Sequence, residues 1–190
     1  MNERILIFID GGYLSKISKY FGDGRHLRFD LVIFGERLAQ RHQLVCEHIF
    51  YYTAPPFQGS PPTPLETKLK AGYDSFVNKI RKNKIVTVRE GRLQKIGNKF
   101  TQKGVDTLLT MDLCREPFSR GVTTIILLAA DTDFVPILDE LRSKMGIKVI
   151  LVYFSDRIRD SRFSMSNHLL TVCDIPILLT RDDFTTIQRQ

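Results

Sequence analysis

The sequence is short of the residues that cross-links, structural metal sites and membrane spans require. Only three cysteines occur among 190 residues, and no CxxC spacing is present, which argues against a disulfide framework or a zinc site. We expect Cys46, Cys114 and Cys173 to be buried thiols in a reducing compartment. No apolar run approaches the roughly 18–20 residues that cross a bilayer, and the run at 5–9 is too short for a signal-peptide core. A cytoplasmic protein with no membrane partner is therefore expected.

Histidine is also scarce. The four histidines, at positions 26, 42, 48 and 168, have neither metal-ligand nor triad spacing, and no serine or cysteine lies beside a candidate base. Nucleophilic catalysis of the serine or cysteine type is therefore not indicated.

The charge balance is distinctly basic. A net charge of +7 and a pI near 9.4 favour polyanionic partners, of which nucleic acid is the commonest. Basic balance can also serve solubility alone, and net charge does not separate these two interpretations.

Apolar runs alternate with segments of helical periodicity along the whole chain. We expect strands at 4–9, 44–53, 84–89, 123–129, 147–153 and 175–179, and helices at 29–41, 65–82, 105–114, 134–144 and 161–171. Five prolines make 54–64 a surface loop, and the basic segment 92–103 is expected to be an exposed loop or hairpin. The alternation predicts one domain over 1–190, an α/β sandwich with a mostly parallel sheet.

Aspartates follow two of the apolar strands directly. The first strand ends in Asp10-Gly11-Gly12, and the strand at 123–129 leads into Asp131-Thr132-Asp133. In open parallel sheets, ligands bind at the carboxyl ends of strands where the strand order reverses. If these strands are neighbours, Asp10, Asp131 and Asp133 meet in one crevice, where the glycines allow close approach of phosphate or metal.

A fourth candidate acid is Asp106, near the start of the helix expected at 105–114. A helix start favours an acid electrostatically, so Asp106 and Asp133 could simply cap their helices. Asp112 lies six positions after Asp106, roughly 240° around a helix, and is therefore a weaker candidate.

An all-oxygen cluster of carboxylates selects hard cations, Mg²⁺ or Mn²⁺, over zinc. Such an ion lowers the pKa of bound water and clamps phosphate oxygens, which suits phosphodiester hydrolysis. Asp10, Asp106, Asp131 and Asp133 are thus the candidate catalytic and metal-binding residues.

Three segments together resemble the signatures of NYN-domain proteins, a branch of the PIN-like ribonucleases. They are Ile7-Phe8-Ile9-Asp10-Gly11-Gly12, Lys103-Gly104-Val105-Asp106 and Leu128-Ala129-Ala130-Asp131-Thr132-Asp133-Phe134-Val135-Pro136. The resemblance implies a Rossmann-like three-layer α/β/α sandwich with five to six strands, and acids that bind Mg²⁺ or Mn²⁺ to cut RNA. Two positions depart from the family pattern: Tyr13 replaces an asparagine, and Ala129-Ala130 replaces serine-glycine.

Basic residues gather around the expected site. A stretch of cations runs from Arg81 through Arg89 to Lys103, and a basic rim would hold an RNA backbone while the acids receive one phosphate. Solvated helix and loop faces are the alternative interpretation. The rim candidates are Arg92, Lys95, Lys99, Lys103, Arg157, Arg159 and Arg162.

Tyr51, Tyr52 and Phe57 could stack on bases of a single strand, although core packing is equally expected for one tyrosine of the pair. Tyr13, Thr132 and Ser155 are weaker candidates for lining the crevice.

Two other enzyme classes fit less well. A phosphatase of the haloacid-dehalogenase type needs an acid where Gly12 stands, and a dinucleotide-binding oxidoreductase needs a GxGxxG after the first strand. The expected function is a metal-dependent endoribonuclease acting on single-stranded RNA. The alternative is a non-catalytic RNA-binding or regulatory module with the same fold, and a homo-oligomer or protein partner is possible in either case.

Overall fold

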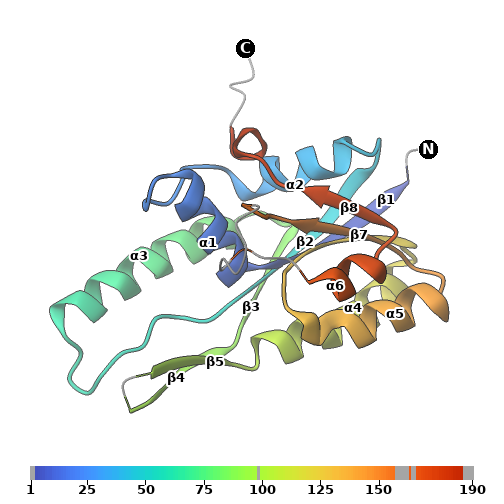
Figure 1. Ribbon diagram of the computed structural model, residues 1–190. Helices are drawn as coiled ribbons and strands as arrows, with labels where there is room; N and C mark the ends of the chain where they lie inside the picture. The colour runs from blue at the N-terminus through green and yellow to red at the C-terminus, as the bar shows by residue number, and fades with distance from the viewer. Residues whose placement is uncertain (1–2, 98, 157–162, 164–165, 186–190) are drawn as a thin grey trace.

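The computed structural model describes residues 3–97, 99–156, 163 and 166–185. Its centre is a parallel six-stranded sheet with the order β3-β2-β1-β6-β7-β8, flanked by helices on both faces (Figure 1). The strands are β1 (Arg4–Asp10), β2 (Val45–Thr53), β3 (Val86–Glu90), β6 (Thr124–Leu128), β7 (Lys148–Tyr153) and β8 (Ile175–Leu178). The predicted α/β sandwich is confirmed, and all six predicted strands belong to this sheet.

Alternation along each strand divides the core into two layers. In β1, Ile5, Ile7 and Ile9 pack toward α1 (Gly11–Phe21), α2 (Leu31–Gln40) and the end of α3 (Pro64–Arg81). Leu6 and Phe8 pack toward α4 (Val105–Arg120), α5 (Val135–Ser143) and α6 (Asn167–Thr171). Burial on both faces explains why these strands are continuous apolar runs.

Helices α2 and α3 begin at side-chain caps. Asp30 caps α2, and Thr63 and Glu66 form a capping box at the start of α3. The 3-10 turn η1 (Thr132–Phe134) precedes α5, and η2 (Arg181–Phe184) follows β8. Helix α1 was not predicted, and α4 continues past the predicted end to Arg120, with Pro117 inside it. The predicted helix at 161–171 lies partly outside the described residues, and α6 is its described part.

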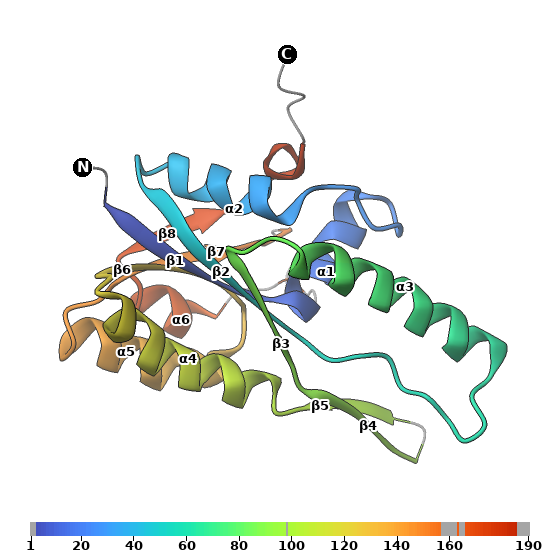
Figure 2. The same cartoon turned by 180° about the vertical axis from the view of Figure 1, so that it is seen from behind.

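The described residues of segment 92–103 form two antiparallel strands, β4 (Arg92–Ile96) and β5 (Lys99–Lys103), so that of the two expected forms, an exposed loop or a hairpin, the structure has the hairpin. It extends from the end of β3, and the 54–63 loop runs between it and α3 in both views (Figures 1 and 2).

Burial at two places does not follow from the sequence pattern. Leu65, Leu69 and Phe76 recur at helical spacing along α3, yet they are exposed, because most of this helix extends past the sheet (Figure 2). Cys114 is exposed and Cys46 only partly buried, so the prediction of three buried thiols holds for Cys173 alone. None of the helices in the described segments is long and apolar enough to span a membrane.

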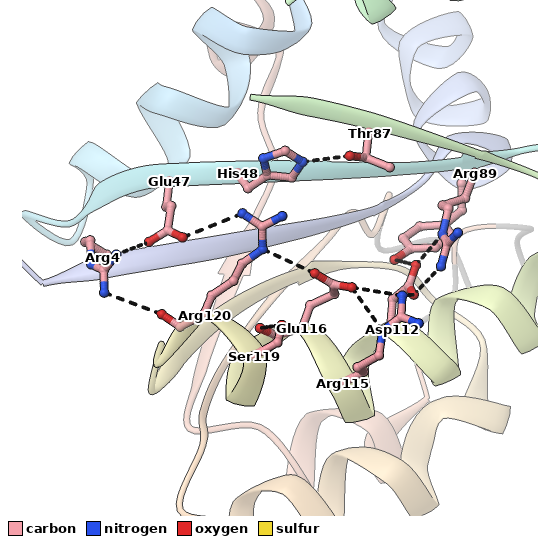
Figure 3. A network of polar contacts seen from close by, with 11 residues as sticks. Arg4, Glu47, His48, Thr87, Arg89, Asp112, Arg115, Glu116, Ser119 and Arg120 are labelled. Atoms are coloured by element: carbon pink, nitrogen blue, oxygen red, sulfur yellow. Dashed lines mark hydrogen bonds and ion pairs between the residues drawn. The ribbon is translucent and has the colours of Figure 1, made fainter. Parts of the chain in front are cut away.

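A ladder of ion pairs fastens α4 beneath the sheet (Figure 3). Its inner end is Asp112, whose side chain is completely buried. Arg89 of β3 donates two hydrogen bonds to this carboxylate, at 2.7 and 2.6 Å, and Tyr52 of β2 donates a third at 3.0 Å. Arg115 adds an ion pair at 3.1 Å. Asp112 therefore joins α4 to two strands of the sheet.

Removing the Arg89 charge should unfold the protein more easily. Arg89→Met keeps most of the side-chain volume but leaves the buried Asp112 carboxylate without its bidentate partner. We expect a loss of about 2–4 kcal/mol in the free energy of unfolding, measured by urea denaturation. Arg92→Met, at an exposed position on β4, is the matched control, and equal unfolding free energies for the two variants would contradict the assigned role.

Candidate active site

The acids predicted from the sequence lie at the switch point of the sheet. Strands β1 and β6 are neighbours in parallel register, with Ile9 beside Leu128. The strand order proceeds outward from them in opposite directions. Asp10 ends β1, and Asp131 and Asp133 follow β6. The carboxyl ends of these two strands therefore bring the three acids to one edge of the sheet.

Asp10 is a half-buried carboxylate held in a fixed orientation. Its Oδ1 accepts hydrogen bonds from the backbone N–H groups of Gly12 (2.8 Å) and Tyr13 (3.2 Å), and it thereby caps α1. Burial raises its pKa, the two N–H donors lower the pKa, and the negative charge of Asp106 raises it. The net result is a pKa above the ordinary value of an aspartate.

Asp106 couples Asp10 to the acids after β6. The pKa of Asp106 is raised by partial desolvation of the carboxyl group and then by the negative charges of Asp131 and Asp133. Asp106, Asp131 and Asp133 are all exposed. The four predicted acids thus form one electrostatically coupled group, although no three acidic, histidine or cysteine side chains in the described part of the chain are grouped closely enough to hold a metal.

Asp106 and Asp133 lie in the first turns of α4 and η1, where the helix dipole favours an acid, but neither caps α4 or α5 through a side-chain hydrogen bond. The N-cap of α4 is Gly104, which has a positive φ of 80° and makes no side-chain cap, so Asp106 does not cap its helix. Helix α5 likewise has no side-chain cap from Asp133. Asp131 does cap, since it accepts from the N–H of Asp133 at 3.0 Å.

The weaker candidates have other surroundings. Asp112 is buried in its ion pairs, and Tyr13 is buried with its hydroxyl bonded to the backbone of Phe154, donating to the carbonyl at 3.2 Å and accepting from the N–H at 2.9 Å. Burial raises the pKa of Tyr13 to about 12. Thr132 is exposed between the two acids of η1, and Ser155 is half-buried just after β7.

The glycine at position 11 makes room for a tyrosine and not for a ligand. A Cβ at Gly11 would lie 2.6 Å from the Tyr51 ring and hydroxyl. Tyr51 and Tyr52 are both buried, so the prediction that they stack on bases was wrong. Burial is the main cause that raises the pKa of Tyr51, and the negative charge of Asp10 raises it further, so the tyrosine lies near this acid.

Two residues near Asp10 were not singled out from the sequence. The Gln102 side chain, on β5, lies 3.6 Å from where a Cβ would stand at Gly12, and Asp10 Oδ1 lies 3.2 Å from the same point. Lys16, exposed on α1, is close enough for its charge to lower the pKa of Asp10. No local sequence motif predicts that α1 and β5 bring these two side chains close to Asp10.

In the folded protein, some cations of the basic stretch from Arg81 to Lys103 are bound to acids and others are exposed on the hairpin. Arg89 is bound to Asp112 and Arg81 to Glu90, while Arg92, Lys95 and Lys103 are exposed on the hairpin. The backbone of Lys99 belongs to β5. The three remaining rim candidates, Arg157, Arg159 and Arg162, lie outside the described residues.

An acidic switch point in a parallel α/β sandwich is the arrangement that the resemblance to PIN-like ribonucleases implies. The chain belongs to the NYN domain family, whose model matches residues 4–180. NYN is a PIN-like ribonuclease family, and membership indicates a nuclease-type function with RNA as the implied substrate.

A protein of unknown function from Vibrio parahaemolyticus shares the fold, with a TM-score of 0.63 at 18% identity over 96% of each chain. A type II dehydroquinase from Butyrivibrio crossotus gives a TM-score of only 0.35 at 13% identity, over 93% of this chain and 88% of the dehydroquinase chain. No curated protein sequence matches the chain.

Adding a methyl group at Gly11 should disturb the packing around Tyr51. In Gly11→Ala the new Cβ meets Tyr51 and the Tyr52 carbonyl at 2.6–2.7 Å, so we expect a loss of about 1–3 kcal/mol in unfolding free energy. Gly72→Ala is the matched control, because Gly72 lies inside α3 with nothing within 4 Å. There alanine should stabilise the protein by about 0.5–1 kcal/mol, and a loss of similar size in both variants would contradict the packing described.

Neutralising Asp10 should stabilise the protein in EDTA. Since its pKa is raised in the folded state, ionisation of Asp10 costs stability, and the cost grows as the pH rises from about 4 through the folded pKa. We expect Asp10→Asn to raise Tm at pH 7 by roughly 2–4 °C, with the difference vanishing below about pH 4.

Asp30→Asn is the control for this comparison. Asp30 caps α2 through hydrogen bonds of 2.9 and 3.3 Å, nearly the geometry of Asp10, and we expect this substitution to lower stability slightly through weaker interaction with the helix dipole. A drop in Tm for Asp10→Asn at pH 7 would show that Asp10 serves only as a cap.

Proposed function

We propose that the protein is a metal-dependent endoribonuclease whose acids are Asp10, Asp106, Asp131 and Asp133. The observation that carries the proposal is the electrostatic coupling of these carboxylates at the switch point of a NYN domain. Mutual repulsion among acids costs stability unless a cation offsets it, so a ligand-binding role accounts for a cluster that stability does not favour.

The donor set fits Mg²⁺ or Mn²⁺ in chemistry and in charge. All four side chains offer carboxylate oxygens, which hard cations prefer. The pKa values of Asp10 and Asp106 are raised mainly by desolvation and then by neighbouring aspartates, and a cation would offset the negative charge of those neighbours. When bound, such an ion lowers the pKa of a water and polarises the phosphate.

The protein's own groups orient and admit the substrate. The Gly12 and Tyr13 N–H groups fix one oxygen of Asp10, and Lys16 and Gln102 lie beside this acid, where a cation and an amide can contact a phosphate. The exposure of Asp106, Asp131 and Asp133 supports entry of an internal stretch of RNA, and hence endonucleolytic cleavage.

A second candidate is a non-catalytic RNA-binding or regulatory module. It is favoured by the spacing of the acids, no three of which are preassembled around one point in the described segments, and by Tyr13, whose hydroxyl is committed to the backbone of Phe154. The cytoplasmic location and the homo-oligomer remain predictions.

Cleavage of single-stranded RNA separates the two candidates. We expect cutting with Mn²⁺ or Mg²⁺ that EDTA abolishes, and a loss of at least roughly 100-fold in Asp106→Asn, because this carboxylate joins Asp10 to the other acids. The assay follows labelled RNA on denaturing gels. Asp139→Asn, an exposed acid within α5, is the control and should cut normally. RNA binding without cutting, unchanged by Asp106→Asn, would establish the module.

A further inference from the structure

The β4–β5 hairpin is positively charged and contains no acid of its own, although the charge of Lys95 lies close enough to Glu66 to lower the pKa of that carboxyl group. Residues 92–103 include four cations and no acid. Arg92 and Lys103 lie directly opposite one another in the antiparallel register, and both are exposed. Like charges in facing positions destabilise a hairpin slightly, and an anion in contact with both would offset this repulsion.

One face of the hairpin also presents an aromatic surface. Strand alternation puts Lys95 and Phe100, which are paired in register, on the same face as Gln102. Phe100 is 53% exposed. Its ring lies 5.5 Å from that of Phe57 in the proline-rich loop, and the Lys95 Nζ lies 5.7 Å from both ring centroids.

This face is continuous with the acidic site. Gln102 reaches the side of Gly12 next to Asp10, and Phe100 is two residues further along the strand, about 7 Å away. The opposite end of β5 passes through Gly104 into α4 and Asp106. An RNA chain with a phosphate at the acids therefore places a neighbouring nucleotide over Phe100.

We propose that Phe100, backed by Phe57 and flanked by Lys95, is a subsite for an unpaired base of single-stranded RNA. The base stacks on the exposed ring, and Lys95 pairs with a phosphate of the same strand. The inference rests on the proposed function, since it takes the acids as the position of the scissile phosphate. Duplex RNA is disfavoured here, because paired bases do not expose their faces to a protein ring.

Binding of a short labelled oligouridylate in EDTA, followed by fluorescence anisotropy, tests the subsite without cleavage. Phe100→Leu keeps an apolar side chain but removes the ring, and we expect Kd to rise about 10-fold, within the range of one base–aromatic stack. Phe100→Tyr should bind like the wild type. Lys95→Gln should weaken binding and reduce the slope of log K against log salt by about 0.7.

Phe118→Leu is the matched control, because Phe118 is 52% exposed near the far end of α4, and its affinity should not change. Circular dichroism and Tm of Phe100→Leu report whether the hairpin substitution leaves the fold intact.

Three results would overturn the subsite: no binding of oligouridylate by the wild type, equal affinities for Phe100→Leu and wild type, or an equal loss in Phe118→Leu. Cleavage is scored separately with Mn²⁺. Binding that depends on Phe100 in a protein that does not cut RNA supports the subsite and refutes the nuclease. Metal-dependent cutting that is indifferent to Phe100 supports the nuclease and refutes the subsite.

Discussion

The buried carboxylate of Asp112 is the interaction on which the geometry of the site depends. Asp10 lies beside Tyr52 in the β1–β2 register, and the Tyr52 hydroxyl donates to Asp112. Asp112 in turn stands on α4, whose first turn carries Asp106. The position of Asp106 relative to Asp10 is therefore set by strand β2, the hydrogen bond from Tyr52 to Asp112, and helix α4. Arg89 closes the same contact from β3, the strand that leads into the hairpin.

The ion pair between Asp112 and Arg89 contributes mainly to the position of α4 and less to the stability of the fold. Apolar residues of similar volume often stabilise a fold as well as a buried ion pair does, because desolvation offsets much of the attraction. They would not, however, fix the rotation and height of α4, whereas a bidentate contact to Arg89 allows only one register. The ladder continues from Asp112 through Arg115, Glu116 and Arg120 to Glu47 of β2 (Figure 3), so α4 is held along most of its length.

The sequence was sufficient for the sheet and for the position of Asp10, Asp131 and Asp133 at one edge of it, because both follow from the apolar strands and the residues after them. The sequence did not predict α1, because this helix begins with two glycines and its only start signal is the N-cap residue Asp10. In the sequence analysis Asp10 was interpreted as a metal ligand and not as a helix cap. The sequence also misjudged α3, whose periodic Leu65 and Leu69 face solvent beyond the sheet edge. Lys16 and Gln102 were missed because their proximity to Asp10 is set by packing between elements and not by spacing along the chain.

An acidic site that acts on RNA has to solve an electrostatic problem, because its carboxylates repel the phosphates that they must receive. Cations distributed evenly over the surface would raise affinity for RNA without directing it to the acids. Here the β4–β5 hairpin holds four cations and no acid of its own, and it leads through Gly104 into the helix of Asp106. On the proposed function, a bound cation would offset the repulsion among the acids, and the RNA phosphates would offset the repulsion within the hairpin. This accounts for the position of the two clusters beside each other.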